Sequence, residues 1–276
     1  MVNAAIQTAT PALDVDLYLA RIGWRGTLRP SFETLAALLR AHMRAIPFEN
    51  LDVLLGRPVR LDLASLASKL VTARRGGYCF EHATLFAAVL EAAGFAPVRH
   101  TARVVLFVPR SQAARTHMLL TVACDGRRFV IDPGFGSRAP PFPVPLIDAG
   151  NSPPDATHWM ARAEGHWVLR AGTPERVADC WATTLEPDNL VDFEVGNHFT
   201  STHPSSPFLN RLTLRAQTAD GYVTVMNHDV THVRGNDVHR TTLASRAELR
   251  ALLNERFGFD LPEVLSLRVP TMEDWP

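Results

Sequence analysis

The chain has 276 residues, 46% of them hydrophobic and 20% charged, which is the balance of a folded globular protein and argues against extensive disorder. Its 28 Lys and Arg residues equal its 28 Asp and Glu residues, which argues against nucleic-acid binding through bulk positive charge. Three cysteines, no apolar run near the ~20 residues of a membrane span and no signal-peptide pattern at the start lead us to expect a cytoplasmic protein without a membrane partner.

The first ninety residues are predicted to be helical. Ser31 is a suitable N-cap, hydrophobic residues follow it at helical spacing, and Pro47 ends that segment. A second helix is expected from Asp62, and a third from about Cys79 to Gly94, a residue typical of helix C-termini.

After Gly94 the pattern changes to short β-type runs, and an Asp125-Gly126 pair signals a hairpin. The predicted strands cover 98–108, 117–124, 127–132, 167–170, 213–216 and 222–227. A proline-rich stretch over 139–155 is expected to be a long loop, and a closing helix over 245–257 begins with a capping-box pattern. Helices first, a β-rich middle and a mixed end predict an α+β fold.

The turn before the third helix places a cysteine in a setting that favours reactivity. In the run RRGGYCFE (74–81) two glycines allow a sharp turn, and Cys79 follows at the helix start. The helix dipole and free N–H groups there favour a thiolate. A free cysteine is more often a small buried hydrophobe, and we keep that interpretation for Cys124 and Cys180, which lack such a setting.

A thiol nucleophile needs a base, and the hairpin supplies a candidate pair. A symmetric loop pairs 124 with 127, which puts His117 opposite Gly134 and makes His117 and Asp132 diagonal neighbours, roughly 7–8 Å apart at Cα. An Asp at this position would orient the imidazole toward the thiol. A one-residue slip would put the two on opposite faces. Counting along the hairpin leaves a surface His and a turn Asp as an equally open alternative.

Metal binding is not expected. His228 and His232 are four residues apart, with His198, His203 and His239 nearby, but this spacing suits zinc only on a helix, and 223–233 alternates like a strand. The run Gly134-Phe135-Gly136 lacks the Lys and the helix of a phosphate loop, although its glycines permit close backbone approach to a ligand.

Four blocks of sequence stand in a distinctive order. They are IPFENL (46–51), RGGYCFE (75–81), TH (116–117) with DPGFG (132–136), and STHPSSPF (201–208). In this order they resemble the arylamine N-acetyltransferases, and only the final third of the chain lacks a clear motif. Ala83 stands where that family usually has Asn, which puts one polar contact near the cofactor in doubt, and Pro133 stands where it usually has Val.

The resemblance implies a three-part fold, with a core like that of cysteine proteases and transglutaminases. From this resemblance we expect a helical bundle over 1–94 that carries the nucleophile, a β-barrel over 95–205 that carries the His and Asp, and an α/β lid over 206–276. Cys79, His117 and Asp132 become nucleophile, base and orienting residue. Cofactor contacts fall on Thr116, Gly134 and Gly136, and acceptor-lining positions on Phe48, Phe135 and Phe208, for which plain core packing is the alternative.

The activity that the resemblance implies is N-acetylation of arylamines and arylhydrazines by acetyl-CoA, with a role in xenobiotic metabolism. The expected mechanism is ping-pong through an acetyl-cysteine, and similar family positions predict a buried pair of Arg75 with Glu49. The physiological acceptor, the preferred acyl chain and the oligomeric state, a homodimer included, stay open.

A hydrolase or transglutaminase-like enzyme with the same triad is the nearest alternative function. The other alternative is a non-catalytic ligand- or DNA-binding protein. Its main support is the excess of arginine in a chain whose one lysine is Lys69. The arginines are scattered along the chain, and we attribute their excess to codon usage.

Overall fold

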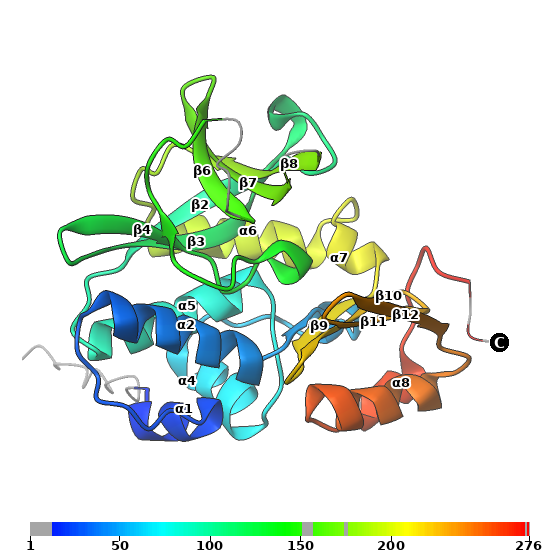
Figure 1. Cartoon of the computed structure of the whole chain (residues 1–276). Helices are drawn as coiled ribbons and strands as arrows, with labels where there is room; N and C mark the ends of the chain where they lie inside the picture. Colours follow the sequence, from blue (N-terminus) through cyan, green and yellow to red (C-terminus); the bar gives the residue numbers. More distant parts are fainter. Residues whose placement is uncertain (1–12, 151–156, 174–175, 274, 276) are drawn as a thin grey trace, which may run out of the picture.

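Helices form the first part of the chain in the computed structural model, which describes residues 13–150, 157–173, 176–273 and 275 (Figure 1). The predicted helix starts are confirmed, because Ser31 and Asp62 cap helices with their side chains and a further helix begins at Cys79. The elements are α1 (Val15–Ile22), α2 (Phe32–Ala45), α3 (Leu51–Leu54), α4 (Leu63–Leu66), the π-helical η1 (Ala67–Thr72) and α5 (Cys79–Ala92).

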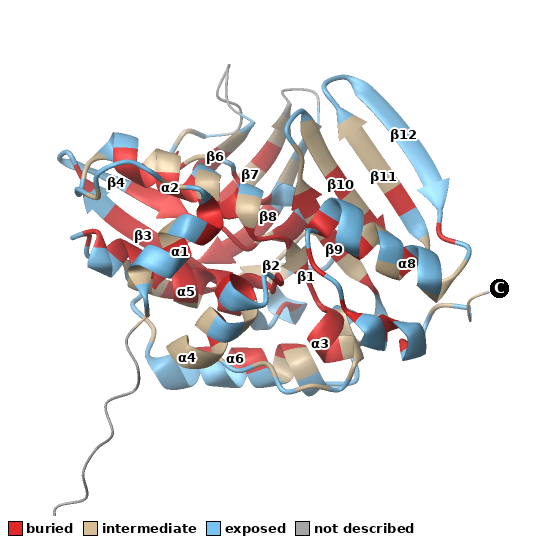
Figure 2. Cartoon of the chain, turned by 90° about the horizontal axis from the view of Figure 1, so that it is seen from below, coloured by how far each residue is buried: buried red, intermediate tan, exposed pale blue. Residues whose placement is uncertain are grey.

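Helix α5 lies at the centre of the first hydrophobic core. Its first five residues, Cys79 to Ala83, are all buried, and Phe86, Val89 and Leu90 are buried further along, so it lacks a solvent face over its first turns (Figure 2). On its barrel side it packs against strand β3 (Arg115–Cys124). This burial places the side chain of Cys79 inside the molecule, where neighbouring charges act strongly on it.

An antiparallel seven-stranded sheet follows, in the order β5-β4-β3-β2-β8-β7-β6. Its edges meet where Ala149 N, just beyond β5, donates to Met160 O on β6 at 3.0 Å, so the sheet curls into a nearly closed barrel. The other strands are β2 (Val98–Val104), β4 (Arg127–Ile131), β5 (Val144–Pro145), β6 (His158–Ala163), β7 (His166–Thr173) and β8 (Arg176–Thr183).

Several sequence predictions in this region need correction. The strand expected over 98–108 ends at Val104, where pairing to β3 has already shifted at a bulge after Ala102, and η2 (Arg110–Gln112) follows. The loop expected over 139–155 is preceded by η3 (Gly136–Arg138) and contains β5, while 151–155 lies outside the described residues. Strand β7 extends beyond the predicted 167–170, and β6 and β8 were not predicted.

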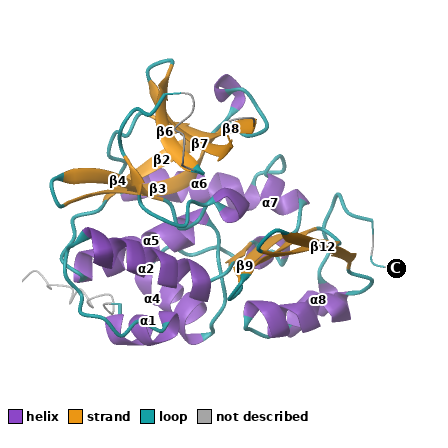
Figure 3. Cartoon of the chain, in the orientation of Figure 1, coloured by secondary structure: helices purple, strands orange, loops and turns teal. Residues whose placement is uncertain are grey.

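The last part combines helices α6 (Leu190–Thr202) and α7 (Pro207–Asn210) with a second antiparallel sheet (Figure 3). That sheet has the order β1-β9-β10-β11-β12, and its first strand, β1 (Phe48–Glu49), comes from the helical part of the chain. The rest are β9 (Thr213–Gln217), β10 (Gly221–Met226), β11 (Asp229–Arg234) and β12 (Asp237–Thr242), covered by α8 (Arg246–Leu252), η4 (Leu253–Phe257) and η5 (Pro262–Ser266).

The strand predicted over 222–227 is confirmed as β10, and the segment 223–233, which alternates like a strand, continues into a second one, β11. Asn227 adopts a left-handed conformation (φ 55°) and turns the chain between β10 and β11. The closing helix does begin at Ser245, whose side chain accepts from Glu248 N, and it becomes π-helical after Leu252. The fold is α+β, and none of the described helices is long and apolar enough to cross a membrane.

Candidate active site

Two glycines shape the turn that presents Cys79. A Cβ on Gly76 would lie 2.0 Å from the carbonyl oxygen of Pro47, and a Cβ on Gly77 would lie 2.6 Å from Oε2 of Glu81. Only glycine permits both approaches, because real Cβ atoms do not come this close to other atoms. The turn therefore brings strand β1 and a carboxylate against the first residues of α5, and Cys79 is left 3% exposed.

The predicted register of the β3–β4 hairpin is confirmed. Cys124 pairs with Arg127 and Leu120 with Ile131. His117 and Asp132 consequently meet, with His117 Nε2 2.8 Å from Asp132 Oδ2. Asp132 is fully buried and His117 is 2% exposed, so the alternative of two surface residues is wrong.

Two further donors hold the carboxylate of Asp132. Trp181 Nε1 donates to Oδ2 at 2.8 Å, and Gly134 N donates to Oδ1 at 3.3 Å. The sequence gives no sign of the contact with Trp181, because 49 residues separate the two and strand β8 was not predicted. With three donors around it, the carboxylate has one orientation in which all its hydrogen bonds are made.

The pairing sets the charge of His117. Burial acts to lower its pKa, but the charge and hydrogen bond of Asp132, together with a hydrogen bond to Cys79, outweigh burial and raise the pKa to about 10. At neutral pH the ring is therefore an imidazolium. Because Nε2 faces Asp132, Nδ1 is the nitrogen left for the thiol, whose Sγ also lies 3.7 Å from Thr116 O.

Of the residues expected to contact a cofactor, Thr116 and Gly134 lie against Cys79. A Cβ on Gly134 would lie 2.6 Å from Cys79 Cα, so the backbone after Asp132 runs directly against the cysteine. Gly136 has a left-handed conformation (φ 63°) and faces the ring of Phe48. Thr116 is half-buried beside His117. Contact with a cofactor stays a prediction for all three.

The three predicted acceptor-lining phenylalanines also gather here. Phe135 lies edge-on to His117 with ring centroids 4.8 Å apart, and Phe48 and Phe208 lie 6.0 Å apart. Tyr78, next to the cysteine, lies edge-on to Phe208 at 5.6 Å. All three phenylalanines are half-buried against the first core, so packing and ligand contact are both compatible with their positions. Ala83, the departure from the family pattern, is fully buried in α5.

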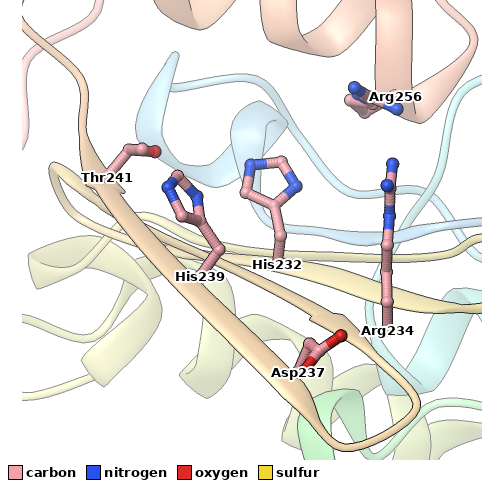
Figure 4. Close-up of a pocket in the computed structure, with 6 residues that line it drawn as sticks. All are labelled: His232, Arg234, Asp237, His239, Thr241 and Arg256. Atoms are coloured by element: carbon pink, nitrogen blue, oxygen red, sulfur yellow. The ribbon is translucent and has the colours of Figure 1, made fainter.

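The C-terminal histidines lie elsewhere. His232 and His239 face each other across β11 and β12 in a cavity of about 350 Å³ that Arg234 and Arg256 also line (Figure 4). Burial, Arg256, His239 and Arg234 lower the pKa of His232, a positive setting that disfavours a cation. Across the residues that the structure describes, no group of three or more His, Cys, Asp or Glu side chains is arranged to hold a metal ion.

This cavity is separate from Cys79. His232 shares a sheet face with Val230, which packs on the core under α8, whereas Phe48 pairs with Arg215 on the opposite face.

Comparison with known proteins places this geometry in context. The sequence profile of a family described as N-acetyltransferase matches residues 31–265. The chain is 37% identical over 265 residues to an arylamine N-acetyltransferase of Mycobacterium tuberculosis, and 35% identical over 249 residues to one of Escherichia coli; these alignments cover 92% and 89% of both chains. The structure of the Mycobacterium marinum arylamine N-acetyltransferase in complex with CoA matches with a TM-score of 0.84 at 32% identity, covering 91% of this chain and 94% of that one.

Proposed function

The chain belongs to the arylamine N-acetyltransferase family, and from this membership we propose that it acetylates arylamines and arylhydrazines with acetyl-CoA, in two steps, through an acetyl group carried on Cys79. The observation that carries the proposal is the placement of Cys79 at the start of α5, hydrogen-bonded to a His117 that is itself held by Asp132. A nucleophile, a base and an orienting carboxylate in this relation are the requirements of covalent acyl transfer.

In the first step the thiolate of Cys79 attacks the thioester carbonyl of acetyl-CoA. The bond between the carbonyl carbon and the CoA sulfur breaks, and the imidazolium of His117 gives its proton to the departing CoA thiolate. One thioester replaces another, so the acetyl-cysteine keeps the reactivity of the donor.

In the second step the nitrogen of an arylamine attacks the acetyl-cysteine. Aromatic amines are mostly neutral at pH 7, so the lone pair is available without prior deprotonation. His117, neutral after the first step, takes the proton that the nitrogen loses, and the amide leaves while Cys79 returns as a thiolate. The acetylated Cys79 no longer helps to raise the pKa of His117, and Asp132 alone then supports its basicity.

Binding roles follow from the positions around the thiol. We assign Thr116, Gly134 and Gly136 to the acetyl-CoA side, since Thr116 O and the backbone of Gly134 lie against Cys79 and Gly136 follows in the same loop, facing Phe48. The half-buried rings of Phe48, Phe135 and Phe208 provide apolar walls for an aromatic acceptor.

The test is intact-protein mass spectrometry after brief incubation with acetyl-CoA and no acceptor. Wild type is expected to gain one acetyl group that disappears when aniline is added, and Cys79→Ala is expected to gain none. Cys180→Ala is the matched control, because burial raises the pKa of the Cys180 thiol to about 12 and leaves it inert. An unmodified wild type, or an adduct that survives in Cys79→Ala, would contradict acetyl transfer through Cys79.

A further inference from the structure

Lys69, the one lysine in a chain that otherwise uses arginine, lies in a buried charge cluster behind the nucleophile turn. Its side chain is 15% exposed, and its ammonium contacts Glu81 Oε1 at 2.7 Å and Asp52 Oδ2 at 2.8 Å. It stands in the π-helical segment η1, a local irregularity that is frequent at functional sites. An ammonium is a compact charge that reaches two carboxylates in different directions, whereas a guanidinium is a larger planar fork.

A second cation, Arg75, joins the same cluster. Asp52 Oδ1 also accepts from Arg75 at 2.6 Å, and Arg75 bonds Glu49 Oε1 at 2.6 Å. Glu49, Asp52 and Glu81 thus share Lys69 and Arg75 at 2.8 Å or less, and Arg57 lies farther out, 3.8 Å from Asp52 Oδ1. Lys69 is the cation whose nitrogen contacts Glu81 directly, so the charge state of Glu81 depends on it most closely.

Glu81 connects this cluster to the nucleophile. Its Oε2 accepts from Tyr78 N at 3.1 Å, at the residue before Cys79, while its Oε1 accepts from Lys69. Each carboxylate oxygen therefore has its donor, and a proton on either oxygen would displace one of them. The missing side chain of Gly77 is what allows the carboxylate to close beneath the turn.

We propose that Lys69 is a positioning residue for the nucleophile: its ammonium keeps Glu81 as the carboxylate that fixes the first turn of α5 and sets Cys79 against His117. The inference rests on the proposed function only in taking Cys79 as the nucleophile. Proton uptake by Glu81 frees either Tyr78 N or Lys69, and the first turn of α5 loses a restraint.

Glu81 is poised to respond to pH. Burial raises its pKa to about 7; Lys69 acts in the opposite direction and Glu49 adds to the rise. A cavity of about 850 Å³, lined by Lys69 and Glu81 and by exposed residues such as Arg60, gives protons access from solvent. The charged groups around Glu81 are Lys69 from η1, Asp52 from α3, Glu49 from β1 and Arg75 from the turn, with Arg57, Arg60, Asp260 and Glu263 on the cavity wall.

The experiment measures the rate at which iodoacetamide alkylates Cys79 between about pH 5.5 and pH 8.5, the range in which a group with a pKa of about 7 titrates. We expect an inflection near pH 7 in wild type. In Lys69→Met the inflection moves upward by a unit or more, which lowers the rate at pH 7 roughly fivefold. Arg60→Met removes a charge from the same cavity without a contact to Glu81 and should leave the profile unchanged.

Glu81→Gln keeps an oxygen for Tyr78 N but cannot titrate, so its profile should lack the inflection. If circular dichroism shows that Lys69→Met does not fold, the Glu81→Gln variant still tests whether Glu81 causes the inflection. A folded Lys69→Met with the profile of Arg60→Met, or a Glu81→Gln that keeps the inflection, would overturn the proposal. Alkylation needs no acetyl-CoA, so its outcome is independent of whether the acetyl-transfer proposal holds.

Discussion

Tyr18, His42 and His82 form a buried chain of hydrogen bonds that ends beside the nucleophile. Tyr18 Oη lies 2.8 Å from His42 Nδ1, His42 Nε2 lies 2.8 Å from His82 Nδ1, and His82 Nε2 lies 3.1 Å from Pro47 O. Burial lowers the pKa of both histidines, that of His82 to about 4, so both are neutral. The carbonyl can only accept, which makes every donor in the chain point from Tyr18 toward Pro47. Both ring nitrogens of each histidine are therefore occupied, and the two side chains link α1, α2, α5 and the segment leading into β1.

The pair of His117 and Asp132 predicts a pH dependence of stability. The folded-state pKa of His117, about 10, lies above the ~6.5 of a free imidazole. A raised folded-state pKa stabilises the fold fully below pH ~6.5, and this stabilisation is lost as the pH rises toward 10. Asp132→Asn removes the largest interaction that raises the pKa.

We therefore expect the free energy of unfolding of wild type to exceed that of Asp132→Asn most at pH ~6, and this excess to shrink by at least about 1.4 kcal/mol, the equivalent of one pKa unit, by pH ~10. Urea unfolding of both proteins across this range measures the difference. An excess that stays constant with pH would show that the pairing does not raise the pKa of His117.

At the scale of elements, strong local signals predicted most of the structure around the site. Side-chain caps marked the helix starts at Ser31, Asp62 and Ser245, and the hairpin loop determined which residues pair across β3 and β4. Helix α6 was not predicted, because its buried positions include Gly196, Asn197 and Thr200, which do not form an apolar stripe. Strand β12 escaped because all its residues are exposed and show no alternation.

The glycine turn before α5 yields a prediction at this scale. In Gly76→Ala the new Cβ would lie 2.0 Å from a backbone oxygen of Pro47, which cannot move without displacing β1. We expect acetyl transfer to fall at least tenfold and the thermal midpoint to drop by several degrees, because the turn and the nucleophile shift together.

Gly56→Ala is the matched control. Gly56 has a left-handed conformation (φ 68°), but no atom lies within 4 Å of the place that a Cβ would take, so the variant should lose only ~1 kcal/mol of stability and keep its activity. Thermal melts and initial rates of the two variants make the comparison. Equal effects in both would mean that close approach to Pro47 does not matter.

At the scale of the whole molecule, the segment after Pro47 ties the helical part to the C-terminal sheet. Strand β1 pairs with β9, and the side chain of Asn50 bonds Phe208 O, Arg211 O and Thr213 N. Arg75 bridges the same parts, since it pairs with Glu49 and Asp52 and its guanidinium lies 5.9 Å from the ring centre of Phe259. The nucleophile turn therefore stands where the two parts join.

Arg75→Ala should cost stability first and activity as a consequence. It leaves the buried carboxylates of Glu49 and Asp52 without their shared partner, for which a loss of about 3–5 kcal/mol is expected. Arg74→Ala, at the exposed neighbouring position, should melt like wild type. Thermal unfolding and activity below the melting temperature measure the effect, and an inactive Arg75→Ala with an unchanged melting temperature would contradict it.

Local sequence was enough to predict the features that depend on neighbours along the chain: the helix that begins at Cys79, the glycine turn before it, and the register that brings His117 to Asp132. Capping, turn geometry and strand alternation act over a few residues, so their patterns can be recognised in the amino-acid sequence. Three contacts became visible only in the folded chain: Trp181 with Asp132, the histidine chain from Tyr18 to Pro47, and Lys69 enclosed between Asp52 and Glu81. Such contacts join residues up to tens of positions apart, and burial sets both their geometry and their charge, which no local pattern encodes.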